Sequence, residues 1–172
     1  MTAPLDPNKP AAGQEFLPDY LLFLLATASA AASEGFHARA RQAGLRVPEW
    51  RVLGSLHDQD GQMITRLAQL SLMEQSRLTR VVERMVDRGL VIRQGDAGDR
   101  RRVRVWMTDE GRALARRVVA EARSHEAGLI ALLGEAEGRQ LKDLLKRLHH
   151  LASEAEGSAP HPALGPAVAE DA

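Results

Sequence analysis

Residues 64–111 decide the fold of this chain, and they read ITRLAQLSLMEQSRLTRVVERMVDRGLVIRQGDAGDRRRVRVWMTDEG. Apolar side chains recur there at the spacing of an amphipathic helix, in two runs separated by a turn around residues 72–73. The positions expected to face inward are Ile64, Leu67 and Ala68 in the first run and Leu78, Val81, Val82, Met85 and Val86 in the second. Gly89 then ends the second helix, because glycine readily adopts a left-handed conformation after a last turn. The stretch therefore predicts two consecutive helices joined by a tight turn.

Two short runs of β-forming residues follow the second helix, at residues 90–92 and 103–106. The segment between them, residues 93–102, is rich in glycine and aspartate and ends in the triplet Arg100-Arg101-Arg102. Glycine and aspartate favour turns, so this pattern predicts a β-hairpin with a basic tip. Two helices followed by such a hairpin are typical of a winged helix-turn-helix, which is a DNA-binding unit.

The polar face of the second helix carries long or hydrogen-bonding side chains of the kind that reach phosphates and base edges. The expected DNA contacts in the helices are Thr65, Gln75, Ser76, Arg77, Thr79, Arg80 and Arg84, with Arg84 on phosphate. An arginine-rich helix face is more often simply solvated, and we interpret Arg88 and Arg93 as surface residues of that kind. The hairpin is different, because three adjacent like charges repel each other unless a phosphate backbone or a narrow minor groove lies nearby.

The sequence resembles the MarR-type bacterial transcription regulators. The resemblance rests on VPEWRVLGSL, LAQL, LTRVVERMVDRGLV and DRRRVRVWMTDEGRAL, in this order and spacing, and covers roughly residues 17–151. It implies that Asp99 braces the wing and that Arg100 and Arg101 reach the minor groove, with Arg102 as an additional contact. Arg77 and Glu74 depart from the family pattern, which has a small polar residue and a serine N-cap there. The operator sequence therefore does not follow from relatives.

The composition of the chain limits which kinds of protein and which kinds of binding site it can form. The 172 residues suffice for one domain with a proper core, and their formal net charge is zero. Between residues 64 and 104, however, ten arginines stand against five acidic residues, which indicates a defined DNA-facing surface in a neutral protein. The chain has no cysteine, which excludes disulfides, thiolate metal sites and a thiol redox switch.

The flanking sequence predicts more helices and a mainly α fold with a small β-hairpin wing. We expect a disordered segment over 1–15, dimerisation helices over 16–45 and 112–155, the winged helix-turn-helix DNA-binding domain over 46–111, and a flexible tail over 156–172. The first helix is expected to be long and largely buried. A leucine stripe along the last helix is either ordinary core or a contact with a second copy; a homodimer is favoured because one chain offers no further layer, and twofold symmetry suits a palindromic operator.

The apolar run Leu21–Leu25, followed by small residues, superficially resembles a signal peptide. No positively charged segment precedes it, and the run is too short to span a bilayer. We therefore expect a cytoplasmic protein without a membrane partner.

No catalytic or metal site is predicted. The six histidines lack ligand spacing; His149 and His150, for example, are adjacent and diverge on a helix. No nucleophile elbow, phosphate loop or supported carboxylate pair occurs. We expect neither enzymatic activity nor a cofactor.

The resemblance also implies a small aromatic acid or phenol as effector, bound where the dimerisation helices meet the winged unit. Candidate lining residues are Ser29, Ser33, Phe36, His37, Trp50, Arg51, Leu53, Gly54 and His57. The aromatic residues among them equally suit an ordinary core, and Arg51 equally suits a solvent-facing position. The function expected is a homodimeric repressor released from a pseudo-palindromic operator by that ligand. The alternatives are a ligand-independent architectural DNA-binding protein and an enzyme or metal-binding module on the same fold.

Overall fold

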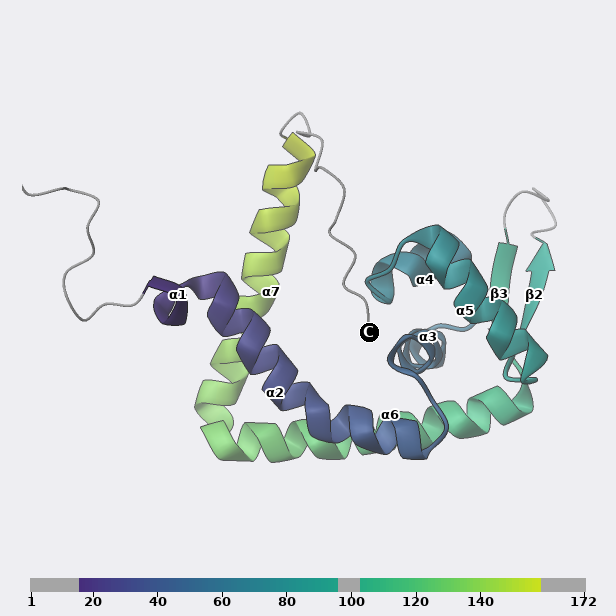
Figure 1. Cartoon of the computed structure of the whole chain (residues 1–172), viewed down its shortest axis with the longest axis horizontal. Coiled ribbons are helices and arrows are strands. Elements are labelled where there is room, and N and C mark those ends of the chain that lie inside the picture. The colour runs from purple at the N-terminus through teal and green to yellow at the C-terminus, as the bar shows by residue number, and fades with distance from the viewer. Residues whose placement is uncertain (1–15, 96–102, 159–172) are drawn as a thin grey trace, which may run out of the picture. The chain divides into compact units, whose positions relative to one another are not determined.

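The computed structural model describes residues 16–95 and 103–158 of the chain (Figure 1). Backbone contacts divide the chain into two units, with the boundary inside helix α6 after His125. The elements of the first unit are α1 (Phe16–Asp19), α2 (Leu21–Gln42), α3 (Val47–Asp58), β1 (Gln62–Met63), α4 (Ile64–Leu70), α5 (Gln75–Asp87), β2 (Val91–Gly95), β3 (Val103–Met107) and the larger part of α6 (Asp109–Leu133). The second unit holds the end of α6 and α7 (Glu135–Ser158).

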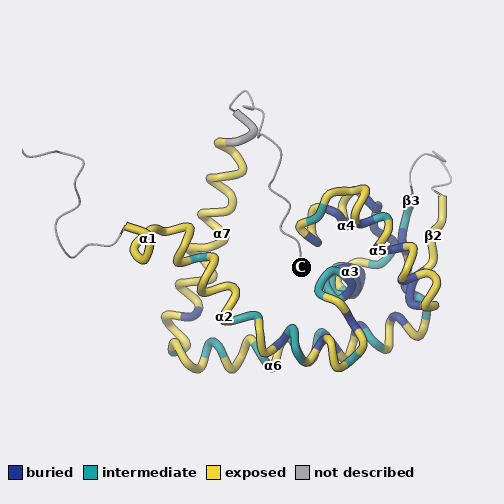
Figure 2. The backbone as a smooth tube through the Cα atoms, viewed as in Figure 1, coloured by how far each residue is buried: buried dark blue, intermediate teal, exposed yellow. Residues whose placement is uncertain are grey.

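The core of the first unit lies where α3, α4 and α5 pack together. Its largest fully buried side chains include Leu53, Leu56, Leu67, Leu78 and Met85. Burying a leucine or methionine of this kind stabilises the fold by about 1.5–3 kcal/mol. Figure 2 shows this concentration of buried positions on α3 and on the inner faces of α4 and α5. The predicted inward positions of both helices are confirmed except one.

That exception is Val86, which is 37% exposed. It follows Met85 directly, and each residue turns the helix by about 100°, so Val86 falls at the edge of the stripe that Leu78 and Met85 bury. The prediction that Val86 faces inward was wrong.

The two predicted strands are confirmed and form an antiparallel hairpin, with Val91 opposite Met107 and Gly95 opposite Val103. The sequence analysis missed a third strand, β1, which pairs with β3 and gives the sheet order β1-β3-β2. Two residues are too few to show alternation, so β1 has no signature of its own in the sequence.

The predicted helix ends are confirmed by their capping geometry. Gly89 has a φ of +68°, its N–H donates to the carbonyl of Val86 (2.8 Å), and Leu90 N–H donates to the carbonyl of Met85 (2.9 Å). This pair of bonds is the Schellman ending of α5. At the start of α6 the Thr108 hydroxyl accepts a hydrogen bond from Gly111 N–H at 3.0 Å, as an N-cap does.

Helix α2 differs from its prediction. A break at Tyr20 separates it from the short α1, and at 22 residues α2 is long, as expected. Only Phe36 and Ala40 of α2 are buried, so the expectation of a largely buried helix is wrong for a single chain. Within the described ranges, α2 is also the one helix long and apolar enough, by length and composition alone, to cross a membrane. A helix that packs against other protein passes the same test.

The predicted C-terminal dimerisation region, 112–155, consists of most of α6 and of α7, which extends three residues beyond it. Gly134, with a φ of +94°, separates the two helices. The five leucines of its stripe are all 39–59% exposed (Figure 2). They are Leu141, Leu144, Leu145, Leu148 and Leu151.

Candidate nucleic-acid interface

The polar residues predicted on α5 lie on the face opposite its buried stripe. Gln75, Ser76, Arg77, Arg80 and Arg84 are exposed, and Thr79 is half-buried with its hydroxyl donating to the carbonyl of Gln75 at 2.9 Å. The three arginines have no ion-pair partner in the described part of the chain. The helix therefore presents unpaired guanidinium groups to solvent.

The turn between α4 and α5 forms an open depression of about 680 Å³ that brings Thr65 together with Gln75 and Arg77. Leu72 lies at this turn with a φ of +55° and is 77% exposed. The N-cap of α5 is Glu74, and its side chain makes no capping hydrogen bond. The predicted contacts in α4 and at the start of α5 therefore share one surface.

The predicted wing residues Asp99, Arg100, Arg101 and Arg102 lie outside the described residues. Strand β3, which follows this segment, is anchored to a neighbouring turn. The Arg104 guanidinium donates to the carbonyl of Gly61 at 3.0 Å, and the Trp106 ring covers Gly61 so closely that a Cβ there would lie 2.4 Å from it. These contacts hold β3 against the turn that precedes β1.

Three arginines have structural partners that the sequence analysis did not find. Arg93 of β2 pairs with Glu83 of α5 at 3.4 Å, and Arg88 pairs with the buried Glu49 at 3.0 Å. Arg51 of α3 donates to the backbone carbonyl of Ser71 at 3.1 Å. Arg88 and Arg93 are exposed, as their interpretation as surface residues expected, and each also pairs with a residue of another element. No local signal marks such pairs, since their partners lie far away in sequence.

The structure brings together some of the residues that were predicted to line the effector site. Phe36 is buried, and its ring packs edge-on against Trp50 at 4.9 Å and lies 6.1 Å from the His37 ring. Leu53 is fully buried and belongs to the core. Gly54 lies one helical turn from Trp50 on α3, and His57 is half-buried.

Neither of the two predicted serines lines the depression at the α4–α5 turn or the cavity between α2 and α6 that is described below. Ser29 is exposed, and the Ser33 hydroxyl donates to the carbonyl of Ser29 at 2.5 Å. A serine that bonds back to its own helix offers less to a ligand.

The aromatic cluster contains two unusual polar groups. Desolvation lowers the pKa of the His37 imidazole below 6.5, and the positive charges of Arg51 and Arg41, followed by His125, lower it further. The Trp50 indole N–H is buried and has no hydrogen-bond partner among the described residues. Both observations indicate a poorly solvated environment beside Phe36.

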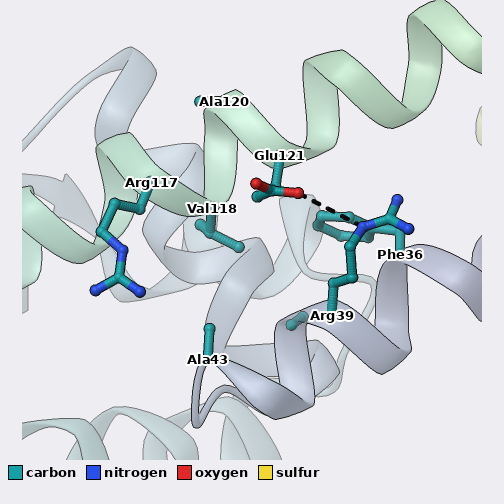
Figure 3. A pocket seen from close by; sticks show the side chains of 8 residues that line it. Phe36, Arg39, Ala43, Arg117, Val118, Ala120 and Glu121 are labelled. Atoms are coloured by element: carbon teal, nitrogen blue, oxygen red, sulfur yellow. Dashed lines mark ion pairs between the residues drawn. The ribbon is translucent and has the colours of Figure 1, made fainter.

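A cavity of about 240 Å³ lies between α2 and α6 within the first unit, and of the predicted effector residues only Phe36 lines it (Figure 3). Apolar carbons form most of its wall, and charged side chains stand at its rim. The other lining residues are Arg39, Ala40, Ala43, Arg117, Val118, Ala120 and Glu121. Arg39 pairs with Glu121 at 3.5 Å, whereas Arg117 has no ion-pair partner in the described part of the chain.

His125 joins the two helices that form the cavity. Arginine can only donate, so the Arg39 guanidinium donates to His125 Nδ1 at 2.8 Å, and His125 Nε2 donates to the carbonyl of Ala32 at 2.7 Å. The imidazole also stacks on Phe36, with ring centroids 6.0 Å apart. These contacts fix the spacing of α2 and α6 at this level. Across residues 16–95 and 103–158, no three metal-ligating side chains lie close enough to hold an ion.

The comparisons with known proteins agree with this geometry. A sequence model described as "MarR family" matches residues 45–103. The transcriptional repressor Rv2887 of Mycobacterium tuberculosis is 30% identical over 105 residues, which is 61% of this chain and 76% of that protein. Its crystal structure in complex with salicylic acid covers 75% of this chain and 96% of that one, at 28% identity and a TM-score of 0.61.

Two further solved structures are similar over most of the described residues. The MarR family regulator SPO1453 from Silicibacter pomeroyi is 52% identical, covering 81% of this chain and 99% of that chain with a TM-score of 0.74. The repressor CouR bound to a 23-mer DNA duplex is 26% identical, covering 79% and 94% with a TM-score of 0.68. The chain belongs to the MarR family of DNA-binding transcriptional regulators.

Proposed function

We propose that this protein is a homodimeric repressor that binds a pseudo-palindromic operator and leaves it when a small aromatic acid or phenol binds. The observation that carries the proposal is the exposed face of α5 beside the β-hairpin, where three arginines have no ion-pair partner among residues 16–95 and 103–158. Unpaired guanidinium groups on a rigid helix suit phosphates and guanine edges without first breaking internal ion pairs.

The exposed apolar faces support a dimer. Phe16, Leu17, Leu21 and Leu22 of α1 and α2 are each more than half exposed, and α7 separately exposes its leucine stripe. Monomeric soluble proteins rarely expose contiguous apolar surface of this kind, and a second copy covers it. The length and apolar composition of α2, which would also suit a membrane span, have the same explanation. Two recognition helices related by a twofold axis then enter successive major grooves roughly 34 Å apart.

The α2–α6 cavity supports an effector site. Its volume of about 240 Å³ suits a single-ring compound, and Phe36 offers a ring face. Arg117, which has no ion-pair partner among the described residues, offers a partner for a carboxylate. The relative Rv2887 has been solved in complex with salicylic acid, so we infer the same chemical class here, such as a hydroxylated benzoate or a pyridine carboxylate. A ligand that fits only one spacing of the helices shifts the population toward that spacing, which weakens operator binding when it differs from the DNA-bound one.

The test is binding of the purified protein to the DNA upstream of its own gene, at two salt concentrations, with and without a panel of aromatic acids. We expect competitor-resistant binding that one compound abolishes in the parent but not in Arg117→Gln, with Arg116→Gln as a matched control on the same helix. Weak, sequence-tolerant binding that no compound alters would favour the architectural DNA-binding protein instead. A chelator that unfolds the protein would favour a metal-binding module.

Replacing one arginine of α5 and one arginine of the predicted wing separates two kinds of DNA contact. Arg77→Ala should relax the preference at one operator position at a cost of about 1–3 kcal/mol, because it removes a base contact. Arg101→Ala should weaken binding to all duplexes and reduce the salt dependence, because it removes a contact with the backbone or minor groove. Titrations against an operator and a scrambled duplex measure both effects. If both variants bind like the parent, the proposed DNA face is wrong.

A further inference from the structure

Arg88, at the C-terminal end of the recognition helix α5, joins that helix to two other elements. Its Nη1 donates to Oε2 of Glu49 in α3 at 3.0 Å, and its Nη2 donates to the carbonyl of Gly44, after the end of α2, at 2.8 Å. The two nitrogens of one planar guanidinium thus hold two separate segments. Lysine, with a single ammonium group, cannot make both bonds in this geometry.

Both acceptors are themselves held in place. Glu49 is only 2% exposed, and its Oε2 also accepts from the backbone N–H of Arg46, the N-cap of α3, at 2.8 Å. Gly44 has a φ of +77°, a conformation that glycine adopts readily, and Leu45 N–H donates to the carbonyl of Ala40 at 2.9 Å, closing α2 with the bond of a Schellman ending. The corner between α2 and α3 therefore presents a fixed carbonyl and a fixed carboxylate to Arg88.

The apolar contacts of α5 constrain its orientation less well than the two hydrogen bonds of Arg88 do. Leu78, Val82 and Met85 bury the inner face of the helix, but apolar burial is non-directional and tolerates small rotations about the helix axis. Two charge-assisted hydrogen bonds at one end impose direction as well as distance. A rotation of α5 that moves Arg77 or Arg80 relative to a DNA groove stretches both bonds.

We propose that Arg88 is a positioning residue for sequence-specific DNA recognition: through Glu49 and Gly44 it sets the rotation and axial position of α5 against the α2–α3 corner. This inference rests on the proposed role of α5 in DNA recognition. Glu49 acts through Arg88 and, being buried, touches no DNA.

The experiment compares R88Q, E49Q and the double variant with the parent. Each protein is titrated over a range of salt with the duplex that the parent selects from a random-sequence pool and with a scrambled duplex. We expect R88Q and E49Q each to lose about tenfold in affinity for the selected duplex, with unchanged affinity for the scrambled duplex and an unchanged salt slope. The double variant should lose no more than either single variant, because the two residues act as one unit. R88K should show a partial loss.

Arg84→Gln is the matched control, since Arg84 lies one turn earlier on the same helix, is exposed, and has no partner among the described residues. If Arg84 contacts phosphate, this variant loses affinity for both duplexes and lowers the salt slope by about 0.9. The same behaviour in R88Q would overturn the positioning role and make Arg88 a phosphate contact. Operator affinity at the parent's level in folded E49Q would overturn it as well.

Folding is checked for every variant by thermal unfolding monitored by circular dichroism. R88Q alone leaves Glu49 as an unpaired buried charge, which strongly destabilises a fold. The double variant removes both charges, so it remains informative if R88Q fails to fold. If the parent selects no sequence from the pool, the proposed function fails; if the parent selects one and the folded variants bind it equally well, only the role of Arg88 fails.

Discussion

At the scale of single residues, the identity of an amino acid does not reveal the backbone strain or the surroundings that it has in the fold. Leu72 adopts the left-handed region at the α4–α5 turn although it has a Cβ, and it is 77% exposed there. His37 lies in an aromatic cluster beside two arginines that disfavour its protonation. Each of these residues affects stability independently of any DNA or ligand contact.

Leu72→Gly should raise the free energy of unfolding by about 0.5–1 kcal/mol. A residue with a Cβ pays a conformational free energy of about 1–2 kcal/mol in the left-handed region, and glycine removes this cost. The greater conformational entropy of glycine in the unfolded chain cancels part of the resulting gain in stability. Urea denaturation at a fixed protein concentration measures the change. Leu70→Gly, at an exposed position within α4, is the control and should lower stability by about 1 kcal/mol. Equal effects of the two substitutions would contradict the role assigned to backbone strain.

His37 should make the protein sensitive to acid. Its pKa is lowered in the folded state, first by desolvation and then by Arg51, so the unfolded chain binds the proton more readily. Its contribution is therefore fully present above the unfolded pKa of 6.5 and is lost as the pH falls through the lower folded value. Melting temperatures between pH 8 and pH 5 should fall less for His37→Gln than for the parent. A profile for the His37 variant identical to that of the parent would refute the assignment.

At the scale of elements, most boundaries follow from local chemistry, whereas the close approaches between elements do not. Gly111 in the first turn of α6 illustrates the difference. It is compatible with a helix, and Thr108 caps that helix as predicted. The structure adds that a Cβ at position 111 would lie 1.9 Å from the carbonyl oxygen of Leu90, at the beginning of the wing.

Gly111→Ala should therefore push the start of α6 away from Leu90, the residue before β2. We expect a loss of about 1–3 kcal/mol or more in unfolding free energy, because backbone rather than a flexible side chain must move. Gly54→Ala is the control, since its added Cβ meets only the Trp50 ring at 3.7 Å, and it should be neutral or stabilising by up to about 1 kcal/mol. Denaturant titration distinguishes the two, and a parent-like Gly111→Ala would show that this contact is not rigid.

At the scale of the whole molecule, a single chain leaves apolar surface that its own residues do not cover. The exposed residues of α1 and α2 in one unit and the leucine stripe of α7 in the other are separate features with the same consequence. Both are explained if a second copy provides the missing layer.

Leu144→Glu should weaken the dimer by roughly 100-fold, which corresponds to about 2.7 kcal/mol, because a carboxylate would replace a buried leucine in the interface. Sedimentation velocity over a range of protein concentrations measures this, and operator affinity should fall in parallel. Lys146→Glu, at an exposed position two residues away, is the control and should leave the assembly unchanged. A parent-like distribution for Leu144→Glu would exclude α7 from the interface.

The sequence by itself determined the elements whose cause is local. Helical periodicity placed α4 and α5, glycine and threonine marked the ends of helices, and turn residues between β-forming runs placed the hairpin. The winged fold and the exposed face of α5 follow from these patterns, because each depends on residues within a few positions of one another.

Only the tertiary structure decided which distant residues meet. Glu49 and Arg88 are 39 positions apart, Arg39 and His125 are 86 apart, and the two-residue strand β1 exists only because β3 lies beside it. The same reason accounts for what the sequence did not predict: the exposed Arg88 and Arg93 have partners that no local pattern reveals, and α2 is apolar without being largely buried in its own chain. Side-chain pairing depends on the distance between elements after packing, which periodicity along the chain does not encode.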